Sequence, residues 1–160
     1  MIRNLITIAI IGGSILGCRV MTGILPQPAS TPTVELQTNK LPTLTGSWKI
    51  TMNHSGGIMG VSRSIEINSD GTYTVSDERT AQIIQGQLSQ EELSNLMDTV
   101  ASSEFISNNE PYGCADCFIY NIKISGDTGF SAQVDDITIE KSGLQPLITK
   151  LRNIMDAELK

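Results

Sequence analysis

The feature that most limits what this chain can fold into is a change of hydrophobic period at Ser89. In residues 47–87, before Ser89, apolar and polar residues alternate, which is typical of half-buried strands. Directly after Ser89, in residues 93–100, apolar residues recur at helical spacing and form one stripe. Ser89 and Glu92 match a capping box, so the sequence predicts a helix that begins here and ends by Ser103.

The alternating pattern predicts an antiparallel sheet. Strands are expected at residues 47–52, 61–67, 72–77, 81–87, 118–125 and 130–134. Ser142 is expected to cap a final helix, in which Pro146 is tolerated because it lies in the first turn. We therefore expect an α+β fold, with about six antiparallel strands and two helices packed on one face, as a single domain of residues 46–160.

The N-terminus has the pattern of a signal peptide. Arg3 gives one positive charge, and residues 5–16 are mostly apolar but too few to span a bilayer, which takes about 20 residues. The stretch ends in Ile15-Leu16-Gly17-Cys18, which resembles the bacterial lipobox. The resemblance implies that residues 1–17 are cleaved off and that Cys18 carries lipid. Two or three acyl chains would make a lasting anchor, because each buried methylene contributes about 0.8 kcal/mol.

Residues 18–45 are expected to be the lipidated cysteine followed by a flexible tether. The segment is rich in Pro, Thr, Ser and Gln, and few apolar residues recur in it with any period. No second apolar stretch reaches spanning length, so the lipid is the membrane contact that the sequence implies. The predicted location is the cell envelope, with the domain facing the periplasm or the cell exterior.

The charge of the chain argues against nucleic acid as a partner. The formal net charge is −6 at pH 7, and no cluster of Lys and Arg supplies the phosphate contacts that nucleic-acid binding needs. No motif for a cofactor is found, and none is predicted.

Cys114-Ala115-Asp116-Cys117 admits three interpretations. The first is a structural disulfide. If Cys18 carries lipid, Cys114 and Cys117 are the two cysteines that remain, and export exposes them to an oxidising compartment in which disulfides persist. A thiol–disulfide redox site is the second, but its first thiol usually lies at a helix N-terminus, and here a strand follows. A zinc site is the third, but the chain has one histidine and no second CxxC pair. No metal site is predicted.

A glycine-rich segment runs from Ser55 to Gly60. Three glycines in six residues indicate positive φ angles or a close backbone approach. One interpretation is a tight strand connection. The other is a loop that lies against a partner, for which the candidate residues are Ser55, Gly56, Gly57 and Ile58.

His54 is the only histidine, and it is expected to be a polar loop residue. A Ser-His-Asp triad would need it as the base, but no G-x-S-x-G nucleophile motif is present. No catalytic residues are predicted.

Several of these features resemble the emfourin-like proteins, inhibitors of thermolysin-type metalloproteases. The segment Ser55–Gly60 is similar to the Ser-Gly-Gly-Phe-Ala-Gly start of that family. Leu88–Glu91 is similar to its helix start, and Phe118–Tyr120 to its aromatic-x-Tyr strand. The likeness covers about residues 46–151. The chain departs from the family in its lipobox, in its CADC motif and in Ile58-Met59, which replaces Phe-Ala.

The leading expectation is a membrane-anchored lipoprotein with a small, non-catalytic binding domain that resembles a protease inhibitor. Its expected partners are the membrane, through the lipid, and an extracytoplasmic protein such as a metalloprotease. The alternatives are an envelope redox protein that uses Cys114 and Cys117, and a purely structural lipoprotein.

Overall fold

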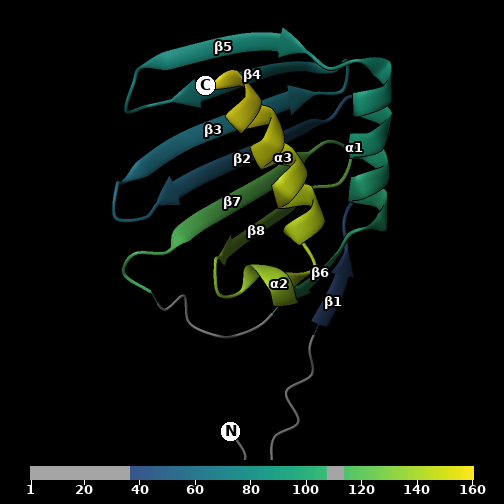
Figure 1. Cartoon of the computed structure of the whole chain (residues 1–160). Helices are drawn as coiled ribbons and strands as arrows, with labels where there is room; N and C mark the ends of the chain where they lie inside the picture. Colours follow the sequence, from purple (N-terminus) through teal and green to yellow (C-terminus); the bar gives the residue numbers. More distant parts are fainter. Residues whose placement is uncertain (1–36, 108–113) are drawn as a thin grey trace, which may run out of the picture. The chain divides into compact units, whose positions relative to one another are not determined.

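The computed structural model describes residues 37–107 and 114–160 (Figure 1). The predicted signal peptide and Cys18 lie outside the described residues. The strands are β1 (Gln37–Lys40), β2 (Lys49–Gly56), β3 (Val61–Asn68), β4 (Thr72–Asp77), β5 (Gln82–Gln87), β6 (Glu104–Ser107), β7 (Phe118–Ser125) and β8 (Phe130–Asp135). The helices are α1 (Gln90–Ser102), α2 (Ile139–Ser142) and α3 (Gln145–Glu158).

Six of the strands form one antiparallel sheet in the order β5-β4-β3-β2-β7-β8. The predicted α+β class and the six-stranded antiparallel sheet are therefore confirmed. Strand β2 lies in the interior of the sheet, between β3 and β7, and pairs with both over all of its eight residues. Residues of β2 consequently have neighbours on both sides, from segments far apart in the sequence.

Helix α1 begins as predicted. The Ser89 hydroxyl accepts a hydrogen bond from the Glu92 amide (3.3 Å), and the Glu92 carboxylate accepts one from the Ser89 amide (2.8 Å). This reciprocal pair satisfies two of the amide groups that a helix start leaves without partners. The helix ends at Ser102, and its buried residues are Leu93, Leu96 and Val100.

The prediction that Ser142 caps the last helix is wrong. Ser142 ends the short helix α2, and its hydroxyl accepts a hydrogen bond from the Leu144 amide (3.1 Å) in the link to α3. Gly143 makes that link with φ +74°, a left-handed conformation that favours glycine at a helix end. Pro146 lies in the first turn of α3, as expected.

The domain begins earlier than the sequence predicts. Residues 37–45, which we expected to belong to the tether, contain β1, and β1 pairs with β6 as a separate two-stranded sheet. Leu41 follows β1 and is buried in the core. The prediction fails because Gln37-Thr38-Asn39-Lys40 has no apolar alternation. Its strand conformation depends on a partner more than sixty residues further along the chain.

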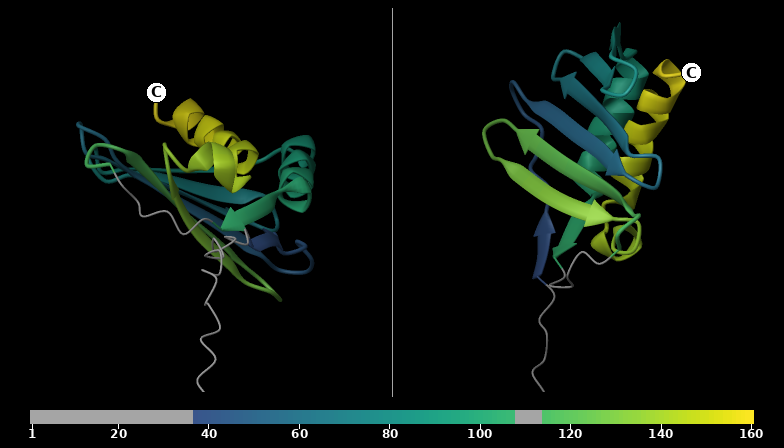
Figure 2. Two further views of the ribbon diagram at one scale, coloured as in Figure 1. Left: turned by 90° about the horizontal axis from the view of Figure 1, so that it is seen from below. Right: turned by 90° about the vertical axis from the view of Figure 1, so that its left-hand side faces the viewer.

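Helix α3 crosses the middle of the large sheet, and the core lies between that helix and the sheet (Figures 1 and 2). Helix α1 packs against α3. The fully buried large side chains are Tyr120, Ile50, Met52, Ile65, Ile67, Leu96, Ile122, Ile124, Leu144, Leu147, Ile148 and Leu151. In the described part of the chain, no helix is long and apolar enough to cross a bilayer.

Candidate functional site

The glycine-rich segment forms the tip of the β2–β3 hairpin. Ser55 and Gly56 are the last residues of β2, and residues 57–60 make the turn, closed by a hydrogen bond from the Gly60 amide to the Gly57 carbonyl (2.9 Å). Gly56, Gly57 and Gly60 have φ angles of +103°, +70° and +60°. Side chains with a Cβ rarely adopt these conformations, so the turn requires the glycines.

Two of these glycines also allow a close approach to the strand that follows the CADC motif. Gly56 pairs with Phe118, and a Cβ on Gly56 would collide with the Cys117 carbonyl oxygen. A Cβ on Gly57 would lie 2.6 Å from the Phe118 ring. The Gly57 amide donates a hydrogen bond to the Cys117 carbonyl (3.2 Å). The two motifs that stand out in the sequence therefore lie side by side.

The hairpin tip presents apolar side chains to solvent. Ile58 is 89% exposed and Met59 is 74% exposed. Of the four predicted partner-binding residues, Ile58 alone is fully exposed, while Ser55, Gly56 and Gly57 are half-buried and shape the hairpin. Met59, which follows Ile58 on the same turn, was not in the predicted set. Adjacent exposed apolar side chains on a tight turn are a candidate protein-binding feature.

Cys114 and Cys117 form a disulfide. Cys114 is exposed and Cys117 is half-buried at the entry to β7. The motif leads directly into strand β7 rather than into a helix whose N-terminus would stabilise a thiolate. The disulfide closes a four-residue loop directly before Phe118, so it restricts the local conformation of the chain at the entry to β7.

His54 is not a loop residue, so that expectation is wrong. Strand β2 continues to Gly56, and the alternation that buries Ile50 and Met52 also places His54 on the inner face, only 6% exposed. Its ring stacks on Tyr120, with centroids 4.8 Å apart and an angle of 13°, and lies 4.9 Å from the Phe118 ring. The sequence signal was present: His54 continues the period of two.

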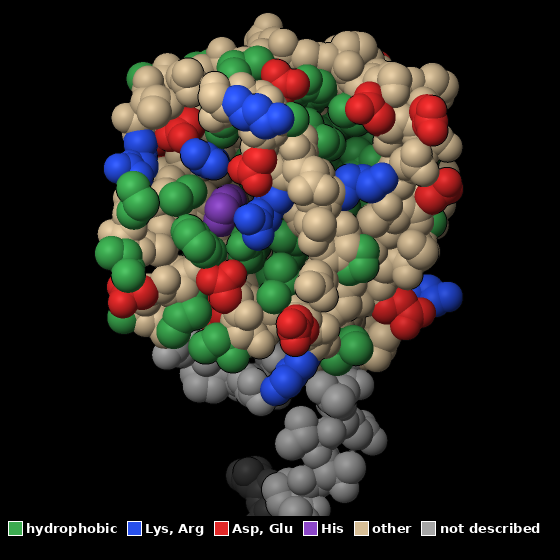
Figure 3. All heavy atoms as spheres, viewed as in Figure 1, with side chains coloured by type: hydrophobic (Ala, Val, Ile, Leu, Met, Phe, Trp, Pro, Cys, Tyr) green, Lys and Arg blue, Asp and Glu red, His purple; other side chains and the backbone are tan. Residues whose placement is uncertain are grey.

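Two arginines lie near His54. The Arg63 guanidinium is hydrogen-bonded to Asp77 (3.0 Å) and Asp156 (3.3 Å), so it has two carboxylate partners. Arg152 of α3 donates a hydrogen bond to the Tyr120 hydroxyl (3.3 Å), and its guanidinium carbon lies 5.9 Å from the centre of the Tyr120 ring. In Figure 3 a small part of the buried histidine (purple) is visible between basic and acidic side chains.

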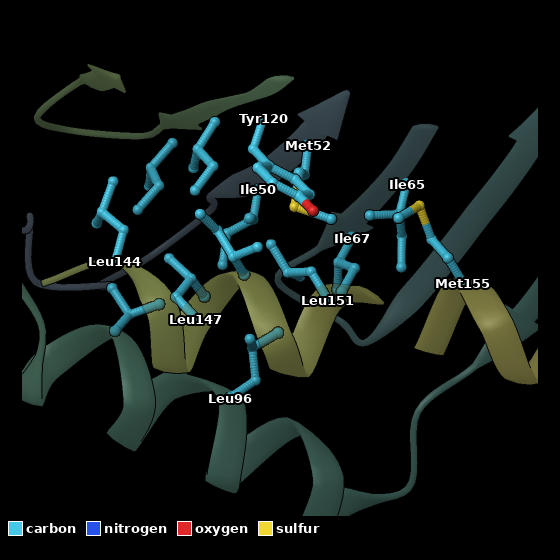
Figure 4. Close-up of a cluster of buried hydrophobic side chains, with 14 of the residues drawn as sticks. Ile50, Met52, Ile65, Ile67, Leu96, Tyr120, Leu144, Leu147, Leu151 and Met155 are labelled. Atoms are coloured by element: carbon cyan, nitrogen blue, oxygen red, sulfur yellow. The ribbon is translucent and has the colours of Figure 1, made fainter. Parts of the chain in front are cut away.

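Tyr120 joins this polar group to the core. Its side chain is 1% exposed and lies beside Met52 in the apolar cluster of Figure 4. Its hydroxyl donates a hydrogen bond to Asp136 (3.4 Å), which also accepts one from the Phe118 amide (2.9 Å). The rings and charges around His54 are therefore held by β2, β7 and α3 together.

Burial, followed by the positive charge of Arg152, lowers the pKa of His54 below its usual 6.5. The unfolded chain then binds more protons than the folded one just below pH 6.5, so the stability that this histidine contributes is lost as pH falls through that range. We expect the free energy of unfolding from urea titrations to be lower at pH 5.5 than at pH 7.5, with a slope of at most about 1.4 kcal/mol per pH unit. Replacing His54→Phe should remove most of this dependence, and an unchanged dependence would contradict the assignment.

A hollow lies between α1, α3 and the β4–β5 hairpin, with a volume of about 520 Å³. Its lining includes Tyr73, Lys150 and Glu158. The Tyr73 hydroxyl donates a hydrogen bond to Glu158 (2.7 Å), and this bond raises the pKa of Tyr73 to about 12. None of the predicted site residues lies in this hollow.

The described ranges, 37–107 and 114–160, contain no group of three or more His, Cys, Asp or Glu side chains placed to hold a metal ion. Compared with protein-family models, the chain matches none. A comparison with curated proteins likewise gives no match. The case for function therefore depends on the geometry of the hairpin tip and its surroundings.

Proposed function

We propose that the chain is a lipoprotein, anchored to a membrane of the cell envelope through Cys18, whose domain binds an extracytoplasmic protein through the tip of the β2–β3 hairpin. The anchor is supported by the apolar leader and by the Ile15-Leu16-Gly17-Cys18 sequence at its end. The Cys114–Cys117 disulfide is consistent with an exported domain, since disulfides persist in oxidising compartments.

The observation that carries the binding proposal is the exposure of Ile58 and Met59 on a turn that is fixed by backbone hydrogen bonds. Leaving two adjacent apolar side chains in water gives up the roughly 1.5–3 kcal/mol that each would contribute if it were buried. The turn is held by its own hydrogen bond and by the bond from Gly57 to Cys117. A tip held in this way loses little conformational freedom when a partner covers it.

The partner class follows from the family resemblance. In that resemblance, Ser55–Gly60 corresponds to the Gly-rich start of metalloprotease inhibitors, and the structure has this segment at the exposed tip. We therefore propose a thermolysin-type metalloprotease as the partner to test first.

The test is inhibition of such a protease by the purified full-length protein and by a tip variant. The double change Ile58→Ser and Met59→Ser should weaken inhibition at least about tenfold, because buried apolar contact residues each contribute on the order of 1 kcal/mol or more. Urea titrations should show that the variant folds as stably as the wild type.

Ile83→Ser is the matched control. Ile83 is 72% exposed on the edge strand β5, so the change removes a similar exposed side chain away from the tip and should leave inhibition unaltered. No inhibition by the wild type at micromolar excess would exclude the inhibitory function. Equal loss in both variants would exclude the tip as the contact.

A further inference from the structure

Strand β5 is an open edge of the large sheet. Among the described strands it pairs with β4 alone, and in Figure 1 it forms the upper margin of the sheet. Its six residues include no charged side chain and no proline, and Ile83 is 72% exposed. Natural edge strands usually carry lysine, proline or a bulge, which keeps other strands from pairing with them. Strand β5 has none of these features, so it can accept a further strand.

The opposite edge of the sheet, β8, is covered in part. The Phe130 ring of β8 packs edge-on against Phe105 of β6, with ring centroids 5.5 Å apart. The short helix α2 also contacts β8. Among the described residues, β5 is therefore the edge that is better placed to take a strand from another molecule.

The hydrogen-bond pattern fixes which backbone groups of β5 face outward. The Leu88 amide donates a hydrogen bond to the Gly71 carbonyl (3.0 Å), directly beyond the paired ends of β4 and β5. Hydrogen-bonded pairs alternate along an antiparallel ladder, so every second residue counted back from Leu88 points its backbone groups toward β4. The N–H and C=O groups of Ile83, Gln85 and Gln87 therefore point toward the open edge.

We propose that two copies of this chain pair through β5, antiparallel and about a two-fold axis that passes beside Gln85. In this register the two copies of Gln85 lie opposite each other, and Ile83 lies opposite Gln87 of the partner subunit. All three outward-facing residues then have a partner, and each opposed pair exchanges two hydrogen bonds. An axis beside Ile84 would instead set Gln87 opposite Ala81, which has φ +53° and lies outside the strand.

The side chains of this segment are compatible with a second copy. The proposed register sets Ile84 opposite Gly86 of the partner subunit, in a pair without hydrogen bonds, where side chains come closest. Gly86 has no side chain, so Ile84 meets no crowding there. Antiparallel pairing also brings the turn before one β5 to the end of the other. Exposed Arg79 of each copy then lies at the same end as exposed Glu91 of the other, and their charges are opposite.

Pairing through β5 goes beyond the function proposed above and does not depend on the hairpin tip. The contact is a single pair of strands, so its affinity in solution is expected to be modest. If Cys18 anchors both copies to one membrane, their effective concentration rises and a weak contact is enough to join them. The pair would present two hairpin tips, and a partner with two binding surfaces would bind it more tightly than it binds one copy.

The test is sedimentation equilibrium of the full-length protein in neutrally buoyant detergent over a range of protein concentrations. The wild type is expected to show a reversible equilibrium between monomer and dimer. Gln85→Pro should raise the Kd of the dimer at least about tenfold, because it removes two hydrogen bonds at the axis that each contribute about fivefold. The Gln85 amide points away from β4, so the proline removes no hydrogen bond within the chain.

Gln85→Lys keeps the amide and places two like charges opposite each other, which should raise the Kd about fivefold. Ser131→Lys is the matched control, since it adds a lysine at an exposed position of the other edge strand, β8, and should leave the Kd unaltered. Urea titrations should show that all three variants fold as stably as the wild type.

A wild type that stays monomeric up to about 1 mM, an effective concentration typical of tethered modules, would overturn the proposal and leave β5 to a strand of another protein. A dimer that is equally tight in the wild type, Gln85→Pro and Gln85→Lys would overturn it as well. Two chains that merely share a micelle would give that second result.

Discussion

Replacing Cys18 with alanine is expected to abolish incorporation of labelled palmitate into the protein. The lipobox resemblance implies that Cys18 receives the lipid, and an alanine has no thiol to form the thioether. Cleavage before residue 18 should fail as well, so a precursor that keeps residues 1–17 should accumulate. The measurement is metabolic labelling followed by mass spectrometry of the purified chain.

The matched control is the double change Cys114→Ala and Cys117→Ala. It removes both cysteines of the disulfide and leaves Cys18 in place, so labelling should continue at the wild-type level. Labelled palmitate in the Cys18→Ala protein would show that the leader is not a lipoprotein signal, and the envelope location would lose its main support.

Replacing Gly143 with alanine should destabilise the domain by about 2–4 kcal/mol. Gly143 has φ +74°, and a Cβ there would collide with the carbonyl oxygen of Glu104. A non-glycine residue in this conformation costs roughly 1 kcal/mol or more, and the collision adds the cost of moving β6 or α3. Leu144 and Leu147, which follow directly, are fully buried, so α3 can shift only by disturbing the core.

Gly129→Ala is the control for this prediction. Gly129 has no positive φ, and the nearest atom to a Cβ there is the Ile124 carbonyl oxygen at 3.9 Å. The change should alter the free energy of unfolding by less than about 0.5 kcal/mol in urea titrations. Similar values for the two variants would mean that the α2–α3 link adapts at little cost.

The sequence predicted those parts of the fold whose signal is local. The period of two located the six strands of the large sheet, and Ser89 with Glu92 located the start of α1. Strand β1 was missed because its polar residues take their conformation from β6. The helix cap at Ser142 was wrong because the chain leaves α2 through a left-handed glycine, and the sequence pattern did not separate α2 from α3.

The candidate site was predicted in pieces, and the contacts that unite it were not. The glycines and the cysteines stood out separately, but nothing in the chain predicts that Gly56 pairs with Phe118, because that depends on the register of β2 and β7. His54 was misplaced for a related reason. The predicted strand ended at Met52, two residues too early to bring the histidine onto the buried face.

The pairing of β1 with β6 shortens the connection between Cys18 and the folded domain. If Cys18 carries the lipid, the connection to the folded domain runs from Cys18 to Gln37 rather than to Gly46. Covalent geometry allows at most about 3.5 Å per residue, so the domain can rise no more than about 65 Å above the membrane surface, roughly 30 Å less than the longer connection would allow. The binding tip can therefore lie no farther from the membrane than that height plus the length of the domain itself, which favours partners that are themselves held close to the same membrane.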